Sequence, residues 1–286
     1  MQRAAETSIL GPAAASVRDA LREATRRLGD SSQSPRLDAE LLLAEVLGCR
    51  RERLILDRDR VLERSHADRF DALLARREAH EPIAYLLGRR DFRHLTLAVD
   101  PRVLIPRPET ELLVEAALGL TRGASVLDVG TGSGAVALAL KDERPDLAIA
   151  GVDISAGAID LARANALNLN LDVSFIVGNL LEGRIERHDA VLANLPYVPD
   201  GASLMDDVAR YEPTGALRGG SDGLDVVRRL VGMLAARPAA SRPGLLALEI
   251  GSEQGAAVAE LVRGAGYGDV QILRDLAGFD RCVVGR

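Results

Sequence analysis

An asparagine, a proline and a tyrosine stand together in the segment ANLPYV, residues 193–198, directly after the apolar run DAVL. The side-chain oxygen of Asn194 can accept one N–H, and a backbone carbonyl of the following turn can accept another. Pro196 fixes the turn, and Tyr197 adds a flat aromatic face. These residue types indicate a site for a planar NH2 group, either a carboxamide or the exocyclic amine of a base. A plain turn asparagine is the simpler interpretation.

A glycine-rich turn follows a second apolar run in SVLDVGTGSGAVALAL. Gly130, Gly132 and Gly134 allow a tight turn and close approach to a ligand, because no Cβ obstructs the backbone. With Ala135 they also satisfy the dinucleotide fingerprint, so the loop alone does not identify its ligand. Asp153 ends the next apolar run, where a carboxylate can accept hydrogen bonds from both hydroxyls of a ribose. The glycine-rich turn and Asp153 together predict an adenosine-bearing cofactor, either a nicotinamide dinucleotide or S-adenosylmethionine.

Asn194, at the end of its predicted strand, discriminates between these two possible cofactors. Ligands of open parallel sheets collect at the carboxyl ends of the strands, so Asn194 and Asp153 should lie at one edge. A nitrogen held there would point at an electrophilic methyl group on a sulfonium, and orientation of this kind can lower a barrier by roughly 7–11 kcal/mol. A dehydrogenase would need a proton relay, and neither Lys141, the only lysine, nor any of the four histidines is an evident candidate. Methyl transfer is therefore favoured.

Short β-rich runs alternate with helical stretches from Pro106 onward. This alternation predicts an α/β fold with a mainly parallel sheet, helices on both faces and right-handed crossovers. The last two runs, DVQILRDL and DRCVVGR, are joined by a tight AGF stretch and should pair antiparallel. The remaining runs are SVLDVG, AIAGVDI, VSFIVGN, DAVLANL and GLLALEIG.

Helical patterns occupy residues 16–88. Ser16 can cap a first helix, and a second should begin at Pro35 and stop at Gly48, with Leu37, Leu41 and Ala44 on its inner face. Alternating apolar residues, followed by an Asp-Pro turn, then predict a β-hairpin. The expected organisation is a helical domain over 1–88, a hairpin linker over 89–105 and a Rossmann-like domain over 106–286.

The charge balance disfavours a nucleic-acid partner. The chain has a net charge of −6, and residues 1–88 hold equal numbers of acidic and basic side chains, whereas nucleic-acid-binding proteins usually carry a basic footprint. No apolar stretch reaches the roughly 20 residues of a membrane span, and no secretory leader is evident, so we expect a cytoplasmic protein. Cys49 and Cys282 should be reduced packing residues, and no spacing indicates a metal site.

The sequence resembles the release-factor glutamine methyltransferases, the HemK/PrmC family, over nearly its whole length. The junction block PRPETE, residues 106–111, discriminates best, because general methyltransferases share the glycine loop but lack this block. The other segments that carry the resemblance are LDAELLLAEVLG, EPIAYLLGRRDF, VLDVGTGSGAVALAL, ANLPYVP, YEPTGALRGGSDGL, LALEIGSEQG and DLAGFDRCVVGR.

The resemblance implies a class I S-adenosylmethionine-dependent methyltransferase with a seven-stranded, mainly parallel sheet whose last strand is antiparallel. It implies methyl transfer to the side-chain amide nitrogen (N5) of the glutamine in the Gly-Gly-Gln loop of peptide chain release factors. The N-terminal helices would help dock the release factor, and we expect a monomer. The residues implied for cofactor binding are Gly130, Thr131, Gly132, Ser133, Gly134, Asp153, Asn179, Leu180 and Asn194; those for the substrate amide are Asn194, Leu195, Pro196 and Tyr197, with Asn194, Pro196 and Tyr197 catalytic.

Two positions depart from the family pattern. Leu195 replaces the first proline of the usual Asn-Pro-Pro-Tyr, so φ is not fixed there by a ring. Asn179 stands where an acidic residue is common. Asn-Leu-Pro-Tyr is also similar to the motif of ribosomal RNA adenine dimethyltransferases, so N6-adenine methylation of RNA or DNA stays an alternative. So do glutamine methylation of a ribosomal protein and a non-catalytic binding module.

Overall fold

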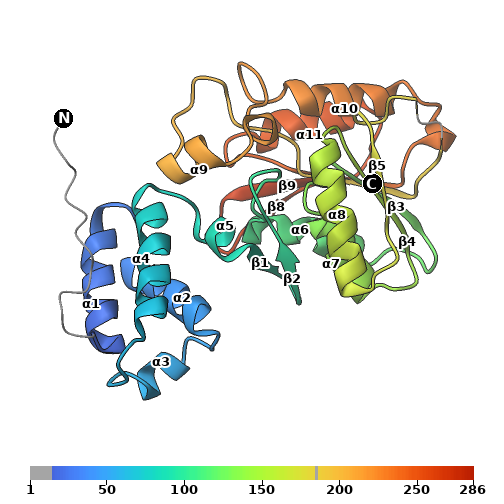
Figure 1. Cartoon of the computed structure of the whole chain (residues 1–286). Helices are drawn as coiled ribbons and strands as arrows, with labels where there is room; N and C mark the ends of the chain where they lie inside the picture. Colours follow the sequence, from blue (N-terminus) through green and yellow to red (C-terminus); the bar gives the residue numbers. More distant parts are fainter. Residues whose placement is uncertain (1–14, 184–185) are drawn as a thin grey trace. The chain divides into compact units, whose positions relative to one another are not determined.

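The computed structural model describes residues 15–183 and 186–286 (Figure 1). The chain divides into two compact units, one formed by residues 1–88 and 205–211 and the other by residues 89–204 and 212–286. The first fourteen residues of the expected helical domain lie outside the described part. Residues 205–211 group with the N-terminal helices although they follow the Asn-Leu-Pro-Tyr segment in the chain. The boundaries at 88, 105 and 106 stay a prediction.

The smaller unit is helical throughout its described part. Ser16 caps its first helix by accepting a hydrogen bond from the Asp19 amide at 3.2 Å, and Gly48 ends the second at φ 61°. Its helices are α1 (Val17–Arg27), α2 (Pro35–Leu47), α3 (Arg53–Leu56), α4 (Arg64–Glu78), α5 (Ile83–Leu87) and α9 (Asp206–Tyr211), with a 3-10 turn at Leu28–Asp30.

The inner face of α2 differs from the sequence expectation. Ala44 is buried as expected, but Leu37 is 39% exposed and Leu41 only half-buried, whereas Leu42 and Leu43 are fully buried. Leu41, Leu42 and Leu43 are successive apolar residues whose side chains point in different directions around the helix. The apolar pattern of the sequence therefore could not show which of them faces the core. Packing against α1 and α4 decides which of the three faces the core.

The predicted hairpin forms from β1 (Arg89–Phe92) and β2 (Leu95–Ala98) and belongs to the larger unit. Its turn lies at Arg93 and His94, with Arg93 at φ 48°, rather than at the Asp-Pro pair that follows β2. Asn165 exchanges two hydrogen bonds with the backbone of Ala98 and donates a third to the carbonyl of Ser133 at 2.9 Å. The hairpin is thereby tied to the glycine-rich turn.

The larger unit is built on a seven-stranded sheet with the order β5-β4-β3-β6-β7-β9-β8. The first five strands in this order are parallel, and β9 pairs antiparallel with both β7 and β8. This is the class I methyltransferase fold, and it confirms the fold expected from the sequence. The strands are β3 (Ser125–Val129), β4 (Ala148–Asp153), β5 (Ser174–Val177), β6 (Ala190–Ala193), β7 (Leu245–Glu249), β8 (Val270–Arg274) and β9 (Asp280–Gly285).

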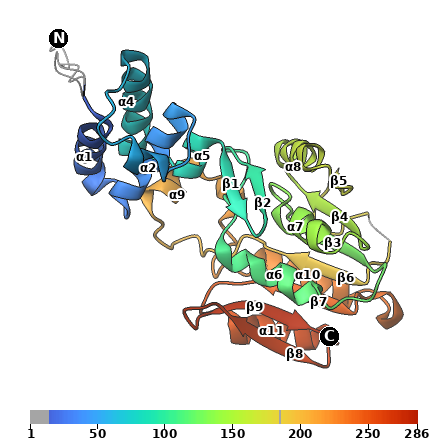
Figure 2. The same ribbon diagram turned by 90° about the horizontal axis from the view of Figure 1, so that it is seen from below.

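Helices cover both faces of the sheet (Figures 1 and 2). Buried side chains of α6, α7 and α8 form one cluster with one face, and those of α10 and α11 form another with the opposite face. The helices are α6 (Glu111–Ala117), α7 (Ala135–Glu143), α8 (Ala156–Leu169), α10 (Asp225–Ala235) and α11 (Gly255–Gly264), with 3-10 turns at Pro108–Thr110, Thr214–Ala216 and Ala239–Ser241.

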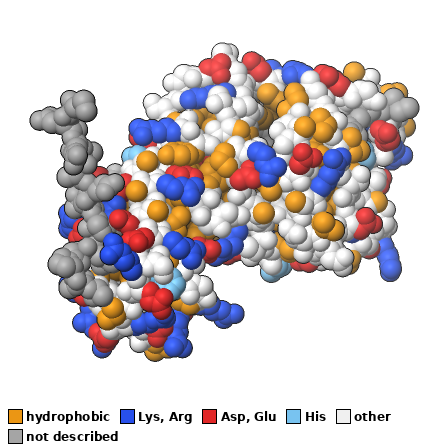
Figure 3. Space-filling model, viewed as in Figure 1, with side chains coloured by type: hydrophobic (Ala, Val, Ile, Leu, Met, Phe, Trp, Pro, Cys, Tyr) orange, Lys and Arg blue, Asp and Glu red, His pale blue; other side chains and the backbone are white. Residues whose placement is uncertain are grey.

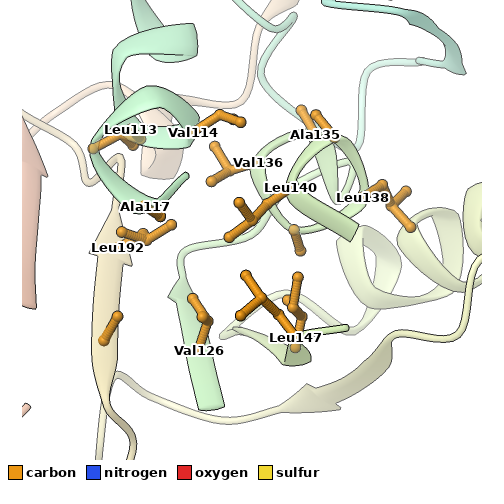
Figure 4. Packing of buried hydrophobic residues seen from close by; sticks show 14 of the residues in the cluster. Leu113, Val114, Ala117, Val126, Ala135, Val136, Leu138, Leu140, Leu147 and Leu192 are labelled. Atoms are coloured by element: carbon orange, nitrogen blue, oxygen red, sulfur yellow. The ribbon is translucent and has the colours of Figure 1, made fainter. Parts of the chain in front are cut away.

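The core beneath α6 and α7 holds the site's strands in place. Leu113 of α6, Leu140 of α7 and Val126 of β3 are fully buried, and their side chains gather in one cluster (Figure 4). Full burial of one such side chain contributes roughly 1.5–3 kcal/mol. Among the residues that the structure describes, no helix is both long and apolar enough to cross a membrane.

Candidate active site

A cavity of about 330 Å³ opens at the carboxyl ends of β3, β4 and β6. Its volume lies in the range of sites for small molecules and cofactors, about 300–1,000 Å³. It brings together almost all residues predicted from the sequence, although they come from four separate segments. Those that line it are Gly130, Thr131, Gly132, Ser133, Asp153, Asn179, Leu180, Asn194, Leu195 and Pro196.

The turn after β3 is shaped by glycines in the left-handed region. Gly130, Gly132 and Gly134 have φ values of 75°, 54° and 83°, a conformation that L side chains rarely adopt. A Cβ on Gly130 would lie 3.3 Å from the carbonyl oxygen of Asn194, so the turn and the asparagine segment touch through backbone. Gly134 does not line the cavity; it begins α7, where a Cβ would crowd Leu138 and Phe175.

The carboxylate of Asp153 closes the next side of the cavity. One oxygen accepts the amide N–H of Gly132 at 2.9 Å, and the other accepts that of Ser155 at 2.9 Å. A carboxylate has about four lone-pair sites, so each oxygen can still accept one hydroxyl proton. Asp153 therefore shapes the glycine turn and still has acceptors for a diol.

Asp128, at the end of β3, is a site residue that sequence reasoning did not single out. It lines the cavity and is 1% exposed. Thr131 donates its hydroxyl to Oδ2 at 2.6 Å, but Oδ1 makes no well-formed hydrogen bond in the described part of the chain. Burial raises the pKa of Asp128 to about 7. A buried acceptor without a firm partner fits a ligand group that donates hydrogen bonds or carries positive charge.

The far end of the cavity is formed by Asn179 and Leu180, which follow β5. Asn179 donates its amide N–H to Glu182 at 3.0 Å, and Arg229 pairs with the same Glu182 oxygen at 3.1 Å. The side-chain oxygen of Asn179 is then the atom that can accept from a ligand amine. Leu180 is 7% exposed and adds an apolar wall.

Asn194 directly follows β6 and lines the cavity together with Thr110. Its amide nitrogen donates to the Thr110 hydroxyl at 3.1 Å. Leu195, next in the chain, is 4% exposed, and its side chain packs beside Gly130. This packing restrains the backbone at the position where the family pattern has a proline.

Tyr197 does not line the cavity. Its hydroxyl lies 3.4 Å from a carboxyl oxygen of Glu249 at the end of β7, and its carbonyl accepts from Gln254 at 3.0 Å. Burial, followed by the charge of Glu249, raises the pKa of Tyr197, so the phenol stays protonated near neutral pH. Burial also raises the pKa of Glu249 to about 7.

Glycines support this segment from behind. The Val198 amide donates to the Leu217 carbonyl at 2.9 Å, and the Gly219 amide donates to the Val198 carbonyl at 3.0 Å. A Cβ on Gly219 would stand 2.3 Å from the Pro196 carbonyl oxygen, and one on Gly223 would stand 2.1 Å from that of Tyr197. The segment after Asn194 therefore rests on a backbone surface that only glycine allows.

The chain is similar to known proteins over most of its length. Residues 19–88 match a family model described as the PrmC N-terminal domain, and residues 108–210 match the methyltransferase small domain. The release factor glutamine methyltransferase of Moorella thermoacetica is 43% identical over 280 residues, covering 93% of this chain and 96% of that protein. The one from Pseudomonas aeruginosa is 44% identical over 262 residues, covering 89% and 94%. The chain belongs to the release factor glutamine methyltransferase family.

One solved structure supports the fold of this family member. The hMettl16 catalytic domain, solved in complex with a 3′UTR hairpin, is 16% identical and has a TM-score of 0.55, with 71% of this chain and 79% of that chain covered. At this identity the likeness shows the shared sheet and helices and does not extend to substrate.

Sequence reasoning missed several residues that shape the site of this family member. Glu212 is 5% exposed and binds the Arg107 guanidinium and the amide of Ile105, which fixes the cavity wall at Leu104 and Pro106. Arg107 and Thr110 stand in the block PRPETE, which the sequence marked as distinctive without assigning a role. Glu212 and Glu249 likewise stand in segments that carry the resemblance, YEPTGALRGGSDGL and LALEIGSEQG, but the sequence assigned them no role, because their partners lie far away in the chain.

Proposed function

We propose that the protein transfers a methyl group from S-adenosylmethionine to the side-chain amide nitrogen of the glutamine in the Gly-Gly-Gln loop of peptide chain release factors. Membership of the family supports the substrate class. One observation carries the chemistry: Asn194, an amide that can grip another amide, shares a cavity with the glycine turn and Asp153.

The residues present fit the cofactor. The turn Gly130–Gly134, of which all residues but Gly134 line the cavity, would hold the methionine end, and the Asp128 carboxyl, whose Oδ1 has no hydrogen-bond partner in the described part of the chain, would bind its ammonium group. Asp153 would accept the ribose hydroxyls with its remaining lone pairs, and Asn179 and Leu180 would lie by the adenine. When bound, S-adenosylmethionine supplies a methyl group on a positively charged sulfur.

The chain's own part in the reaction is to hold the glutamine amide. The Asn194 side-chain oxygen accepts one N–H and the Leu195 carbonyl accepts the other, while Pro196 and Tyr197 shape the turn that follows these two acceptors. Both hydrogen bonds draw electron density toward the amide nitrogen and orient it toward the methyl group. A carbon–nitrogen bond forms as the carbon–sulfur bond breaks, and the amide proton leaves to water. No strong general base is required.

The helical unit is proposed to help dock the release factor, with the enzyme acting as a monomer in the cytoplasm, where translation ends. Ile55, Leu56 and Val61 of this unit are 71%, 77% and 54% exposed, as suits contact with a protein. Figure 3 shows Lys and Arg side chains dispersed among Asp and Glu on one face of the molecule. This mixture, with the net charge of −6, supports a protein substrate over a nucleic acid.

The test offers labelled S-adenosylmethionine with unmethylated release factor, ribosomal protein or RNA, and locates the methyl group by mass spectrometry. We expect N5-methylglutamine in the release factor, and none when its glutamine is replaced by alanine. RNA belongs in the series because Leu195 also suits an adenine methyltransferase. Incorporation into RNA or ribosomal protein alone would refute the proposal.

A matched pair of variants tests the role of Asn194. Asn194→Ala should lower turnover by roughly 10²–10³-fold, because an acceptor aimed at the reacting group is lost, while affinity for S-adenosylmethionine stays within a few-fold. Asn168→Ala, at an exposed asparagine of α8, should change neither quantity. Near-normal turnover of Asn194→Ala would remove Asn194 from the mechanism.

A further inference from the structure

The side-chain amide of Gln254 joins three loops behind the Asn-Leu-Pro-Tyr segment. Gln254 stands directly before α11, in the loop that follows β7. Its oxygen accepts the backbone N–H of Gly251 at 2.8 Å. Its nitrogen donates to the carbonyl of Tyr197 at 3.0 Å and to that of Asp222 at 3.3 Å. One half-buried side chain therefore ties together the loops after β6 and β7 and the glycine-containing loop 219–223.

All three partners of Gln254 are backbone groups, so their hydrogen-bonding character is fixed. A peptide N–H can only donate and a peptide carbonyl can only accept. The side chain must therefore present one acceptor oxygen and two N–H donors in this place. An amide supplies both, whereas a hydroxyl has a single proton to give, a carboxylate has none and an apolar side chain bonds none of the three. The arrangement thus requires glutamine rather than any polar residue of similar size.

The backbone that Gln254 holds is close to the proposed acceptors for the substrate amide. Tyr197 stands two residues beyond Leu195, whose carbonyl is one of these acceptors. Pro196 stands between them, and its ring removes the freedom of one φ angle. A displacement of the Tyr197 carbonyl is therefore passed along this short link to Leu195 instead of being absorbed within it.

We propose that Gln254 is a positioning residue that sets the place of the Leu195 carbonyl and the Asn194 side chain by holding the backbone after them. This role rests on the proposed methyl transfer and adds to it a residue that does not line the cavity. The other end of the segment is fixed at Asn194, where a Cβ on Gly130 would lie 3.3 Å from the carbonyl oxygen. With both ends held, the acceptors are preorganised before the substrate binds.

The first test compares Gln254→Leu with Gln271→Leu, a matched substitution at an exposed glutamine of β8. With release factor as substrate and saturating S-adenosylmethionine, kcat of Gln254→Leu should fall about 10–100-fold, since misplacement by about 1 Å costs up to about 10²-fold. Gln271→Leu should turn over as wild type does, and cofactor affinity, measured by calorimetry, should be unchanged in both. A kcat of Gln254→Leu within about 3-fold of wild type would overturn the inference.

Gln254→Glu gives a readout that a general loss of structure would not give. When protonated, the new carboxyl resembles glutamine, because one oxygen can accept from Gly251 and the hydroxyl can donate to Tyr197. When ionised, it turns a negative oxygen toward two carbonyl oxygens, which raises its pKa above the ordinary value of about 4.3. The ratio of wild-type kcat to that of Gln254→Glu should therefore shrink at least about 3-fold from about pH 8 to about pH 5.5. Groups that titrate in both proteins cancel in this ratio, and a constant ratio would contradict the proposed role.

Amide exchange needs no substrate and separates this inference from the proposed function. The Val198 amide, next in the chain after the Tyr197 carbonyl, donates to the Leu217 carbonyl at 2.9 Å. Its exchange, followed by NMR, should be at least about 10-fold faster in Gln254→Leu than in wild type and unchanged in Gln271→Leu. Equal rates in all three proteins would show that Gln254 does not hold this backbone. Wild-type protein that methylates no glutamine of the release factor would refute the proposed function instead, and the exchange rates would still test the hold on Tyr197.

Discussion

Gly223 tests whether the backbone behind Tyr197 sets the geometry of methyl transfer. Gly223 has φ 80°, and a Cβ there would stand 2.1 Å from the Tyr197 carbonyl oxygen and 2.8 Å from the Gln254 side-chain nitrogen. Ordinary contacts begin near 3.4 Å, so Gly223→Ala must push Tyr197 away by about an ångström or more. The hydrogen bond from Gln254 to this carbonyl would be lost in the same movement.

A second glycine supplies the matched control. Gly123 has φ 77°, and a Cβ there meets nothing within 4 Å. Alanine in the left-handed region costs about 1–2 kcal/mol at either position. Gly223→Ala adds an overpacking cost of about 1–3 kcal/mol. The difference between the two variants isolates the contact with Tyr197 from the cost of the backbone conformation.

We expect both variants to lose stability in urea unfolding, Gly223→Ala by the larger amount. Only Gly223→Ala should lose turnover, about 10²-fold, because a displacement near 1 Å has that effect on aligned reactants. Cofactor affinity should be unchanged in both, since neither glycine lines the cavity. If Gly223→Ala matched Gly123→Ala in stability and turned over as wild type, the backbone support of Tyr197 would not matter to catalysis.

Three further outcomes follow from the same contacts. Asp153→Ala should weaken S-adenosylmethionine binding by roughly 10²-fold or more in calorimetry, as hydrogen bonds to charged groups contribute about 1.5–3 kcal/mol each; unchanged affinity would remove the ribose role. The folded protein holds the Glu249 proton more tightly than the unfolded chain, because burial raises its pKa from 4.5 to about 7. The contribution of the raised Glu249 pKa to the free energy of unfolding is therefore complete below about pH 4.5 and is lost as the pH rises through 7. Between pH 4.5 and 8 the free energy of unfolding of the wild type should fall by about 3 kcal/mol relative to that of Glu249→Gln. Parallel pH curves for the two proteins would contradict this. Leu113→Ala should leave a cavity under α6 and lower the free energy of unfolding, measured by urea titration, by about 2–5 kcal/mol, because Leu113 is fully buried. A loss of less than about 1 kcal/mol would show that the core is not tightly packed there.

Local patterns in the sequence were sufficient to predict the succession of strands and helices along the chain and to identify the residues at the ends of β3, β4 and β6. Gly130, Asp153 and Asn194 could be found because each follows an apolar run, and parallel strands bring such positions to one edge. The inner face of α2 was found only in part, at Ala44, because three successive leucines satisfy the helical period equally well. Tyr197 was expected beside the substrate amide, and the structure places its hydroxyl by Glu249 instead of in the cavity wall.

By itself the sequence determined the class of fold and the family, and it predicted which residues bear the chemistry, since these depend on periodicity and on motifs a few residues long. Only the tertiary structure showed that Asn194 hydrogen-bonds Thr110, that the Tyr197 hydroxyl lies by Glu249 and that glycines support the Tyr197 backbone. The physical reason is sequence separation. Hydrogen bonds between side chains as distant in the chain as Thr110 and Asn194 depend on how strands and helices pack, and no local spacing encodes them.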